Sequence, residues 1–416
     1  MITQTAPQMH LADVPLILLL AGLVAYAVLG GADFGAGFWQ LWGGRGERDR
    51  ALREHAHHAM GPVWETNHVW LIFVLVICWT AYPTAFASIA STLSVPLFIA
   101  GIGIIMRGTA YALRSGTRTL REQRRIEVGF AISSILTPFA LGAVIGGIAS
   151  GRVPVGNAKG DLATSWLNTT SIFIGILAVA TAAYLAAVYL AADAVRVGRS
   201  DLADAFRTRA LGTGVVAGAL ALAGLPIVRS DAPRIWDGLT GGDGLAAVIV
   251  SGLAGVATLA LVFRRRFGPA RVTAALAVAA IVAGWALAQR PDILPGLTVE
   301  QAAAGHSALV AVIVGVAIGG IVLVPSLVLL FGLVLRGRFD PHVVEPRGTF
   351  AVATRAAGTV PLVGVAAGVS LAVGGTLTFF FETSWAHIVG VSALLAFVGL
   401  GFVALASIVV SDDGPD

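Results

Sequence analysis

The chain has 416 residues, of which 57% are hydrophobic and only 12% are charged, and its mean hydropathy is +0.86. A water-soluble domain does not carry so much apolar surface, so the composition predicts an all-α protein that crosses the membrane many times. The net charge of +4 does not indicate nucleic-acid binding, because the basic residues lie in short tracts between apolar segments. The single cysteine, Cys78, excludes an internal disulfide.

Apolar runs separated by polar breaks predict about eleven transmembrane helices, since about 20 helical residues cross the hydrocarbon layer. The first run is long and no basic residue precedes it, so we expect a retained span and not a cleaved signal peptide. The loops are too short for a globular domain. The expected spans are 14–42, 58–86, 92–113, 126–150, 165–195, 210–228, 244–263, 270–289, 305–335, 354–381 and 387–410.

Basic residues gather in alternate loops, which is the pattern that orients membrane proteins with their positive loops in the cytoplasm. The loops between the intervening spans hold only Arg152, Lys159, Arg229, Arg234 and Arg290. This alternation predicts an N-terminus outside the cell and a cytoplasmic C-terminus. The arginine-rich segments are 45–53, 114–125, 196–209, 264–271 and 336–355.

Polar residues interrupt the first two spans. Asp33 lies in the first span between glycines that allow a neighbouring helix to approach closely. In the second span, Glu65 and His68 share one helical face and Asn67 lies between them. Ionisable groups at this depth are costly and are functional candidates by default. A carboxylate and an imidazole one turn apart can exchange a proton, although a structural hydrogen bond at the helix start is the alternative.

The second span also carries Trp64 and Trp70, which we interpret as structural anchors at the membrane interface. Arg107 ends the third span, where it either lies beside a buried carboxylate or extends to the membrane surface. The predicted orientation places all of these buried polar residues in the cytoplasmic half of the membrane: Asp33, Glu65, His68 and Arg107. The histidines offer no convincing pair of axial haem ligands, and we expect no metal site on this chain.

Several motifs together resemble subunit II of the cytochrome bd quinol oxidases. They are Gly31-Ala-Asp-Phe-Gly-Ala-Gly37, Gly61-Pro-Val-Trp-Glu-Thr-Asn-His-Val-Trp-Leu71, Met106-Arg-Gly108, Ala288-Gln-Arg-Pro-Asp-Ile-Leu-Pro295 with Leu297-Thr298, and Val322-Leu-Val-Pro325. The similarity covers about residues 10–340 in consistent order. The similarity therefore predicts a subunit II-like membrane domain of nine spans in residues 1–340. Residues 341–416 are expected to form an extra two-helix extension. We expect that extension to cover the face where small accessory subunits bind in relatives.

The resemblance implies a heterodimer in the bacterial plasma membrane. Subunit I of this family carries haem b, with or without haem d, and oxidises quinol while oxygen is reduced to water. Subunit II ligates no haem and helps to supply protons from the cytoplasm, so the complex is electrogenic without pumping protons. Small accessory subunits, membrane lipids and, in some members, a structural quinone bind to such complexes. By the same resemblance, Asp33, Glu65 and Arg107 fall on the proton route or its polar lining.

Two other functions fit the residues without the resemblance. A stand-alone secondary transporter also has eleven or twelve spans and buried charges. A purely structural haem-free subunit would use its polar residues only to bind lipid and its partner. A stable haem-bearing partner distinguishes the oxidase subunit from the transporter.

Overall fold

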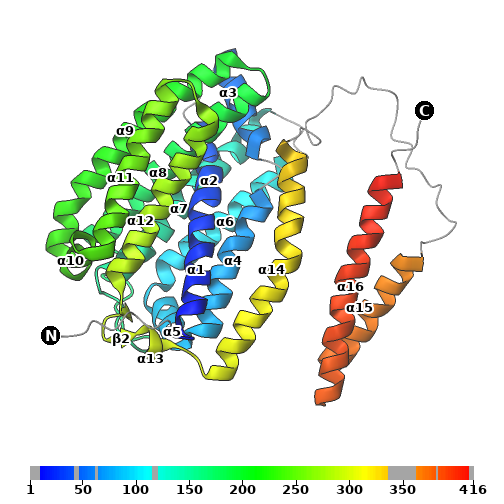
Figure 1. The fold of residues 1–416 in the computed structure, drawn as a ribbon. Helices are drawn as coiled ribbons and strands as arrows, with labels where there is room; N and C mark the ends of the chain where they lie inside the picture. Colours follow the sequence, from blue (N-terminus) through cyan, green and yellow to red (C-terminus); the bar gives the residue numbers. More distant parts are fainter. Residues whose placement is uncertain are drawn as a thin grey trace. The chain divides into compact units, whose positions relative to one another are not determined.

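The computed structural model describes residues 10–41, 46–60, 64–114, 120–335, 362–380 and 383–411 (Figure 1). The chain divides into two units, Met1–Phe339 and Asp340–Asp416. Eight described helices are long and apolar enough to cross a membrane, and three further apolar stretches, Asn67–Ala81, Val363–Thr378 and Ile388–Leu400, are shorter. The helical membrane architecture predicted from the sequence is confirmed, while the count of eleven spans stays a prediction.

The first unit begins with one long apolar helix, and most of the later spans follow as single helices. The elements are α1 Asp13–Ala25, a π-helical turn η1 Tyr26–Gly30, α2 Gly31–Leu41, α3 Glu47–Met60, α4 Trp64–Ala81, α5 Pro83–Thr92, α6 Ser94–Arg114, α7 Leu120–Ala149, α8 Thr169–Arg196, α9 Ser200–Asp231, α10 Pro233–Thr240, α11 Gly242–Phe263, α12 Phe267–Gln289, β1 Asp292–Leu294, β2 Leu297–Thr298, α13 Val299–Ala302 and α14 His306–Leu335.

The structure departs from the expected elements in two places. The predicted span 58–86 breaks at Tyr82, because Pro83 has no amide hydrogen to donate and starts the new helix α5. The Tyr82 hydroxyl donates a hydrogen bond of 2.5 Å to the Ala12 carbonyl, which fixes this break against the start of α1. The segment after Arg290, predicted as a loop, forms an antiparallel pair of short strands in which Asp292 lies opposite Thr298.

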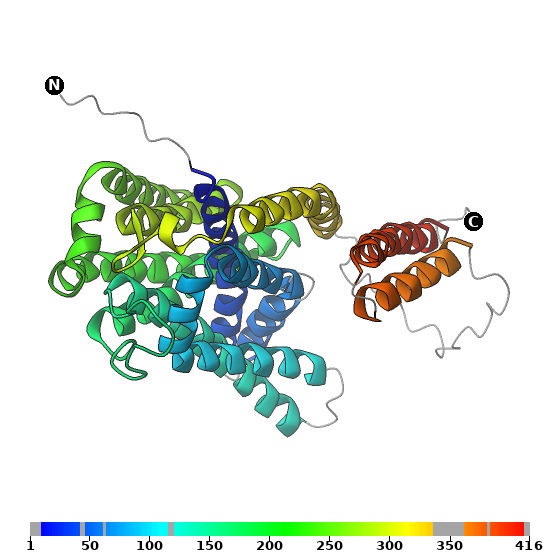
Figure 2. The same cartoon turned by 90° about the horizontal axis from the view of Figure 1, so that it is seen from below.

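Helix α8 forms the centre of the first unit and contacts α2, α7, α9 and α12. Its residues between Ala182 and Ala194 are mostly buried alanine and leucine, so neighbouring backbones approach closely. Figure 2 shows the green helices α9 to α11 on one side of this unit and the blue and cyan helices on the other. Helix α14 contacts α1 and α4 and leaves most of its surface exposed.

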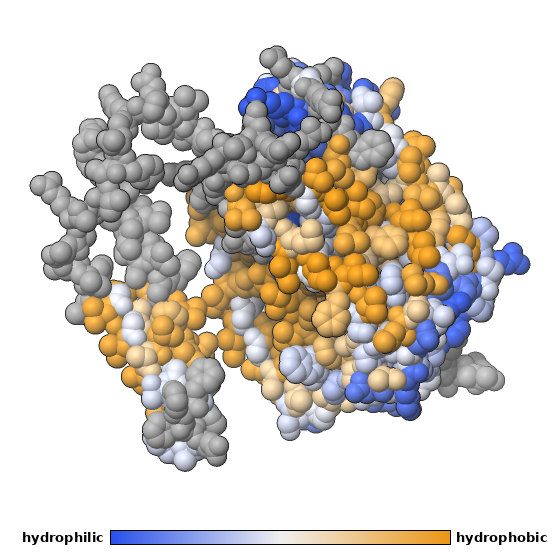
Figure 3. All heavy atoms as spheres, turned by 180° about the vertical axis from the view of Figure 1, so that it is seen from behind, coloured by the Kyte–Doolittle hydropathy of each residue, from blue (hydrophilic) through white to orange (hydrophobic). Residues whose placement is uncertain are grey.

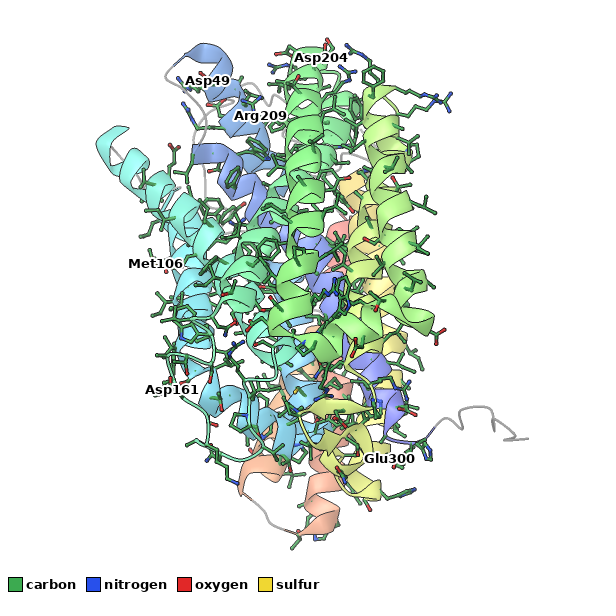
Figure 4. The ribbon with its side chains drawn as sticks, turned by 90° about the vertical axis from the view of Figure 1, so that its left-hand side faces the viewer. Asp49, Met106, Asp161, Asp204, Arg209 and Glu300 are labelled. Atoms are coloured by element: carbon green, nitrogen blue, oxygen red, sulfur yellow. The ribbon has the colours of Figure 1, made fainter. Side chains whose placement is uncertain are left out.

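The surface of the first unit separates apolar from polar residues along the helix axes. Figure 3 shows a broad hydrophobic band with hydrophilic residues toward its upper and lower edges. In Figure 4, Asp49, Asp204 and Arg209 lie at one end of the helices, while Asp161 and Glu300 lie toward the other end. We call the end with Arg209 the arginine-rich end.

The second unit consists of two helices, α15 Leu362–Phe380 and α16 Ser384–Ser411, which pack on each other. Glycines make this packing close: a Cβ atom on Gly374 would lie 2.8 Å from Leu394, and one on Gly390 would lie 3.0 Å from the Thr378 amide nitrogen. Such small-residue contacts are a common way for helices to associate in lipid.

Candidate functional site

An ion pair between α2 and α6 lies buried among the helices. Arg107 Nη2 donates to Asp33 Oδ1 at 2.5 Å and to the Asp33 carbonyl oxygen at 2.8 Å. The two side chains are only 2% and 1% exposed, so the sequence-based alternative in which Arg107 extends to the membrane surface does not describe this structure. Burying two charges is costly unless they are paired and hydrogen-bonded, so this pair is the strongest candidate for function.

Helix α7 completes the surroundings of the guanidinium group. Arg107 Nη1 donates a short hydrogen bond to Ser134 Oγ, and Ser134 Oγ donates to the Phe130 carbonyl oxygen at 2.6 Å. The guanidinium carbon lies 4.2 Å from the centre of the Phe130 ring and 5.1 Å from that of Phe34. Cation–π contacts in a desolvated site add to the stability of the buried charge.

Glycines in α2 and α6 provide the room for this packing. A Cβ atom on Gly37 would collide with Ser134 Oγ and lie 2.9 Å from Arg107 Nη1. A Cβ atom on Gly35 would collide with the Ala182 carbonyl of α8, and one on Gly103 would collide with Thr137. The sequence predicted that a helix approaches closely beside Asp33. The structure identifies α7 and α8 as these neighbours.

The π-helical turn η1 directly precedes the helix that carries Asp33. A π turn inserts one residue into the helix and is often found at functional sites, because it changes the direction of the side chains beside it. Tyr26 begins this turn, and its ring centre lies 6.3 Å from Phe34 and 6.2 Å from His68. The Phe34 and His68 ring centres are 5.9 Å apart, so α4 contacts the aromatic residue that follows Asp33.

The remaining predicted site residues lie in α4. Asn67 is 2% exposed, and its Oδ1 atom has no hydrogen-bond partner among the described residues. The ring centre of Trp70 lies 6.3 Å from that of Phe73. Glu65 and Trp64 belong to the first turn of α4, but their side chains lie outside what the structure describes. The structure therefore brings Asp33 together with Arg107, and it places His68 against Phe34, whose ring also contacts Arg107.

Several buried polar atoms around the pair can still accept or donate a hydrogen bond. Within the described residues, Asp33 Oδ2, Arg107 Nε, Thr137 Oγ1 and the Tyr26 hydroxyl have no hydrogen-bond partner. Buried polar groups are usually satisfied, so these atoms are suited to bind an ordered water molecule. Asp33 Oδ2 is the one carboxylate oxygen of this group, and Arg107 binds the other oxygen of the same carboxylate.

Sequence reasoning missed Tyr26, Phe130 and Ser134. Tyr26 lies seven residues before Asp33, a spacing that places two side chains on one face of an uninterrupted α-helix, but the sequence did not show the π turn that lies between them. Ser134 is one of two adjacent serines in an otherwise apolar span, a weak signal that does not say which helix it contacts. In the parts of the chain that the structure describes, no group of three His, Cys, Asp or Glu residues could hold a metal ion.

Fold and site together define a multi-pass helical membrane protein with a buried, hydrogen-bonded ion pair between two of its helices. A model of the family described as cytochrome bd terminal oxidase subunit II matches residues 11–334. The chain belongs to this family, which confirms the resemblance found in the sequence.

Relatives and a solved structure agree with this assignment. The chain is 28% identical over 134 residues to the cytochrome bd ubiquinol oxidase subunit 2 of Bacillus subtilis, covering 32% of this chain and 39% of that protein. It is 27% identical over 135 residues to the cytochrome bd-I ubiquinol oxidase subunit 2 of Escherichia coli, covering 32% of this chain and 35% of that protein. The structure of the bd oxidase from Geobacillus thermodenitrificans matches with a TM-score of 0.64 and 26% identity, over 79% of this chain and 99% of that one.

Proposed function

We propose that this chain is subunit II of a bacterial cytochrome bd-type terminal oxidase and that it conducts protons toward a haem-bearing subunit I. The family match over residues 11–334 carries the proposal. The aligned parts span well under half of the two subunit 2 relatives, so the activity of the whole complex is part of the proposal. The complex would oxidise quinol and reduce oxygen to water, and this chain would contribute no haem ligand.

Three features of the site support a role in proton transfer. Asp33 has one carboxylate oxygen bound by Arg107 and a second, buried oxygen that has no hydrogen-bond partner among the described residues. His68 packs against the Phe34 ring beside it, and histidine is the side chain best suited to exchange protons near neutral pH. Glu65 lies one turn before His68 on α4, so we propose it as the proton carrier nearest the helix start.

Orientation belongs to the same proposal. The arginine-rich end would face the cytoplasm of a bacterial cell, with the N-terminus outside, because positive loops are retained on that side. Protons taken up there and released outside by quinol oxidation would make turnover electrogenic without pumping. Haem b, with or without haem d, would lie on subunit I, and accessory subunits, lipids and a structural quinone are further partners that the resemblance suggests.

The experiment is to purify the complex from native membranes, record its visible spectrum and measure oxygen consumption with excess quinol. We expect a stable haem-containing partner. In the Glu65→Gln and Asp33→Asn variants, we expect turnover to fall about tenfold or more with an unchanged haem spectrum, since each removes a titratable group from the route. Asp243→Asn, an exposed carboxylate at the start of α11, is the control and should keep wild-type turnover.

The outcomes separate the alternatives. Wild-type turnover in both the Glu65 and Asp33 variants would leave only a structural role for these side chains. A chain that purifies without any haem-bearing partner and takes up a solute by itself would favour the transporter and contradict the oxidase assignment.

A further inference from the structure

The turn between α11 and α12 carries three consecutive arginines, Arg264, Arg265 and Arg266, at the arginine-rich end of the first unit. All three are exposed. The turn follows directly on the apolar helix α11, so in a membrane it lies at the level of the lipid headgroups. Arginines at this level are in reach of lipid phosphate groups.

The three arginines differ in whether a carboxylate already neutralises them. Arg265 forms an ion pair of 2.5 Å with Asp204 of α9, which Figure 4 labels at this end. Its φ of 60° lies in the left-handed region that glycine usually occupies after a helix, and in this conformation its side chain reaches α9. The side chains of Arg264 and Arg266 have no hydrogen-bond or ion-pair partner among the described residues.

A further arginine covers the negative end of α11. The last carbonyl groups of a helix carry partial negative charge, which repels an anion. In α11, the carbonyl oxygens of Val262 and Phe263 accept hydrogen bonds of 3.1 and 2.7 Å from Arg207 of α9. The Arg207 guanidinium carbon also lies 5.3 Å from the centre of the Phe263 ring. The end of α11 therefore does not oppose an anion at this turn.

The start of α12 adds positive potential beside the same turn. The first turn of a helix leaves amide groups without partners inside the helix, and its positive end attracts anions. Gly268 lies in this first turn, and a Cβ atom on it would meet nothing within 4 Å, so the space beside the amides is open. Arg271 follows in the next turn, and its side chain has no hydrogen-bond or ion-pair partner in the part of the chain that the structure describes.

Exposed apolar side chains adjoin the charged turn. Phe263 ends α11, and Val272 and Leu276 are exposed on α12. Gly268, Val272 and Leu276 recur every four residues, so they form one exposed row that begins at the turn and runs along α12. A phospholipid has the same order of parts, with a charged phosphate followed by apolar acyl chains. A free phosphate ion would use only the charged part.

We propose that the turn between α11 and α12 binds the phosphate group of an anionic phospholipid. Arg264, Arg266 and Arg271 donate hydrogen bonds to the phosphate oxygens, because the fork of N–H groups on a guanidinium matches phosphate geometry. The acyl chains lie along the exposed row of α12. A zwitterionic lipid would bring its own positive charge to these arginines, and the Asp204 carboxylate that could receive that charge is already paired with Arg265.

This site is separate from the ion-pair site and does not depend on proton transfer. Only its place in the cytoplasmic leaflet rests on the orientation proposed above. The site is therefore tested by lipid binding, with oxygen consumption of the complex as an independent measurement.

The test uses the purified whole complex after its native lipid has been exchanged for detergent. Its thermal unfolding midpoint is followed during separate additions of phosphatidylglycerol, phosphatidylcholine with the same acyl chains, and glycerol 3-phosphate. We expect phosphatidylglycerol to raise the midpoint at lower concentrations than phosphatidylcholine, and glycerol 3-phosphate to have no effect. Arg264→Gln with Arg266→Gln should weaken the apparent affinity for phosphatidylglycerol about tenfold or more, because two of the three phosphate contacts lose their charge.

A matched control removes two charges from the same end of the helices. Arg50 and Arg199 are exposed there and already pair with Glu54 and Asp201. Arg50→Gln with Arg199→Gln should therefore leave the affinity for phosphatidylglycerol within about twofold of wild type. An equal loss in this control would show a general effect of net charge and would overturn the site.

The remaining outcomes decide between the possible occupants. Wild-type affinity for phosphatidylglycerol in the Arg264→Gln, Arg266→Gln variant would overturn the site. Equal stabilisation by glycerol 3-phosphate would assign the turn to a free anion, and loss of a partner subunit from this variant would assign it to a subunit contact. If the variant does not assemble, Arg264→Lys with Arg266→Lys keeps the charge but not the forked hydrogen bonds. It should bind phosphatidylglycerol severalfold more weakly than wild type, and unchanged affinity would contradict the proposal.

Discussion

The buried pair of Asp33 and Arg107 raises the question whether these two charges serve stability or function. Each charge alone would be strongly unfavourable among apolar helices, and together they are tolerated because hydrogen bonds satisfy them. An apolar pair of similar volume would pack there at equal or lower cost. Stability therefore does not explain why the pair is present, which favours a functional explanation.

The first prediction separates stability from function at this pair. Arg107→Met should destabilise the complex by about 3–5 kcal/mol, because it leaves the Asp33 carboxylate buried without its partner. Asp33→Leu combined with Arg107→Met should recover most of that stability while turnover stays low. The measurements are thermal unfolding and oxygen consumption of the purified complex. Full turnover in the stable double variant would contradict a role for the pair in proton transfer.

The second prediction concerns the close approach of α2 and α7. Gly37→Ala should cost about 1–3 kcal/mol, because its new methyl group would displace Ser134 and disturb Arg107. Gly101→Ala in α6 is the matched control, since a Cβ atom there meets nothing within 4 Å. We expect that control to be neutral or slightly stabilising. Equal unfolding temperatures for the two variants would show that the contact is not tight in the membrane.

At the scale of elements, an ion pair connects helices and a loop at the end of the first unit opposite the arginine-rich end. Arg152, in the loop after α7, donates to both carboxylate oxygens of Asp231 at the end of α9, at 2.9 and 2.6 Å. Thr170 at the start of α8 donates to the same carboxylate at 2.5 Å. The hydrogen bonds that Arg152 donates to Asp231 raise the pKa of its guanidinium group. One carboxylate thus joins three segments.

The third prediction tests this junction. Arg152→Met should destabilise the protein by about 1 kcal/mol, the loss of a two-pronged hydrogen bond discounted for partial exposure. Arg234→Met is the control, because Arg234 makes one hydrogen bond to Asp292 and its side chain is 51% exposed. We expect a change of about 0.5 kcal/mol or less there. Thermal unfolding of the two variants is compared directly. A larger loss for Arg152→Met supports a specific junction, and equal losses would indicate only a general effect of surface charge.

At the scale of the whole molecule, the family match ends at residue 334 and the first compact unit ends at Phe339. Residues 341–416 hold a helix pair with its own internal packing. We propose that this pair is an addition to a complete subunit II.

The fourth prediction follows from that division. A chain that stops at residue 340 should still assemble with its haem-bearing partner and keep turnover within about twofold of wild type, because the truncation removes no residue of the ion-pair site. Co-purification and oxygen consumption measure both properties. Loss of the partner upon truncation would assign the helix pair to the assembly interface. A gain of a small accessory subunit would support the idea that the pair covers its binding face.

The sequence alone determined that the chain is a helical membrane protein of the subunit II family, and it singled out Asp33, Glu65, His68 and Arg107. The length of each apolar run and the rarity of charges within it identify the membrane helices locally. Each span must be apolar enough to cross the lipid and must form its own backbone hydrogen bonds. The position of α3 and the short strands after Arg290 were less visible, since they lie in polar connections without a strong period. The break at Tyr82 lies inside an apolar run, where hydropathy does not mark it.

Only the tertiary structure decided which helices meet. The pairing of Asp33 with Arg107 joins residues 74 positions apart, and Ser134 and Phe130 enter from a third helix. Helix periodicity fixes the face on which a side chain lies, but the neighbour of that face depends on close packing among all the helices.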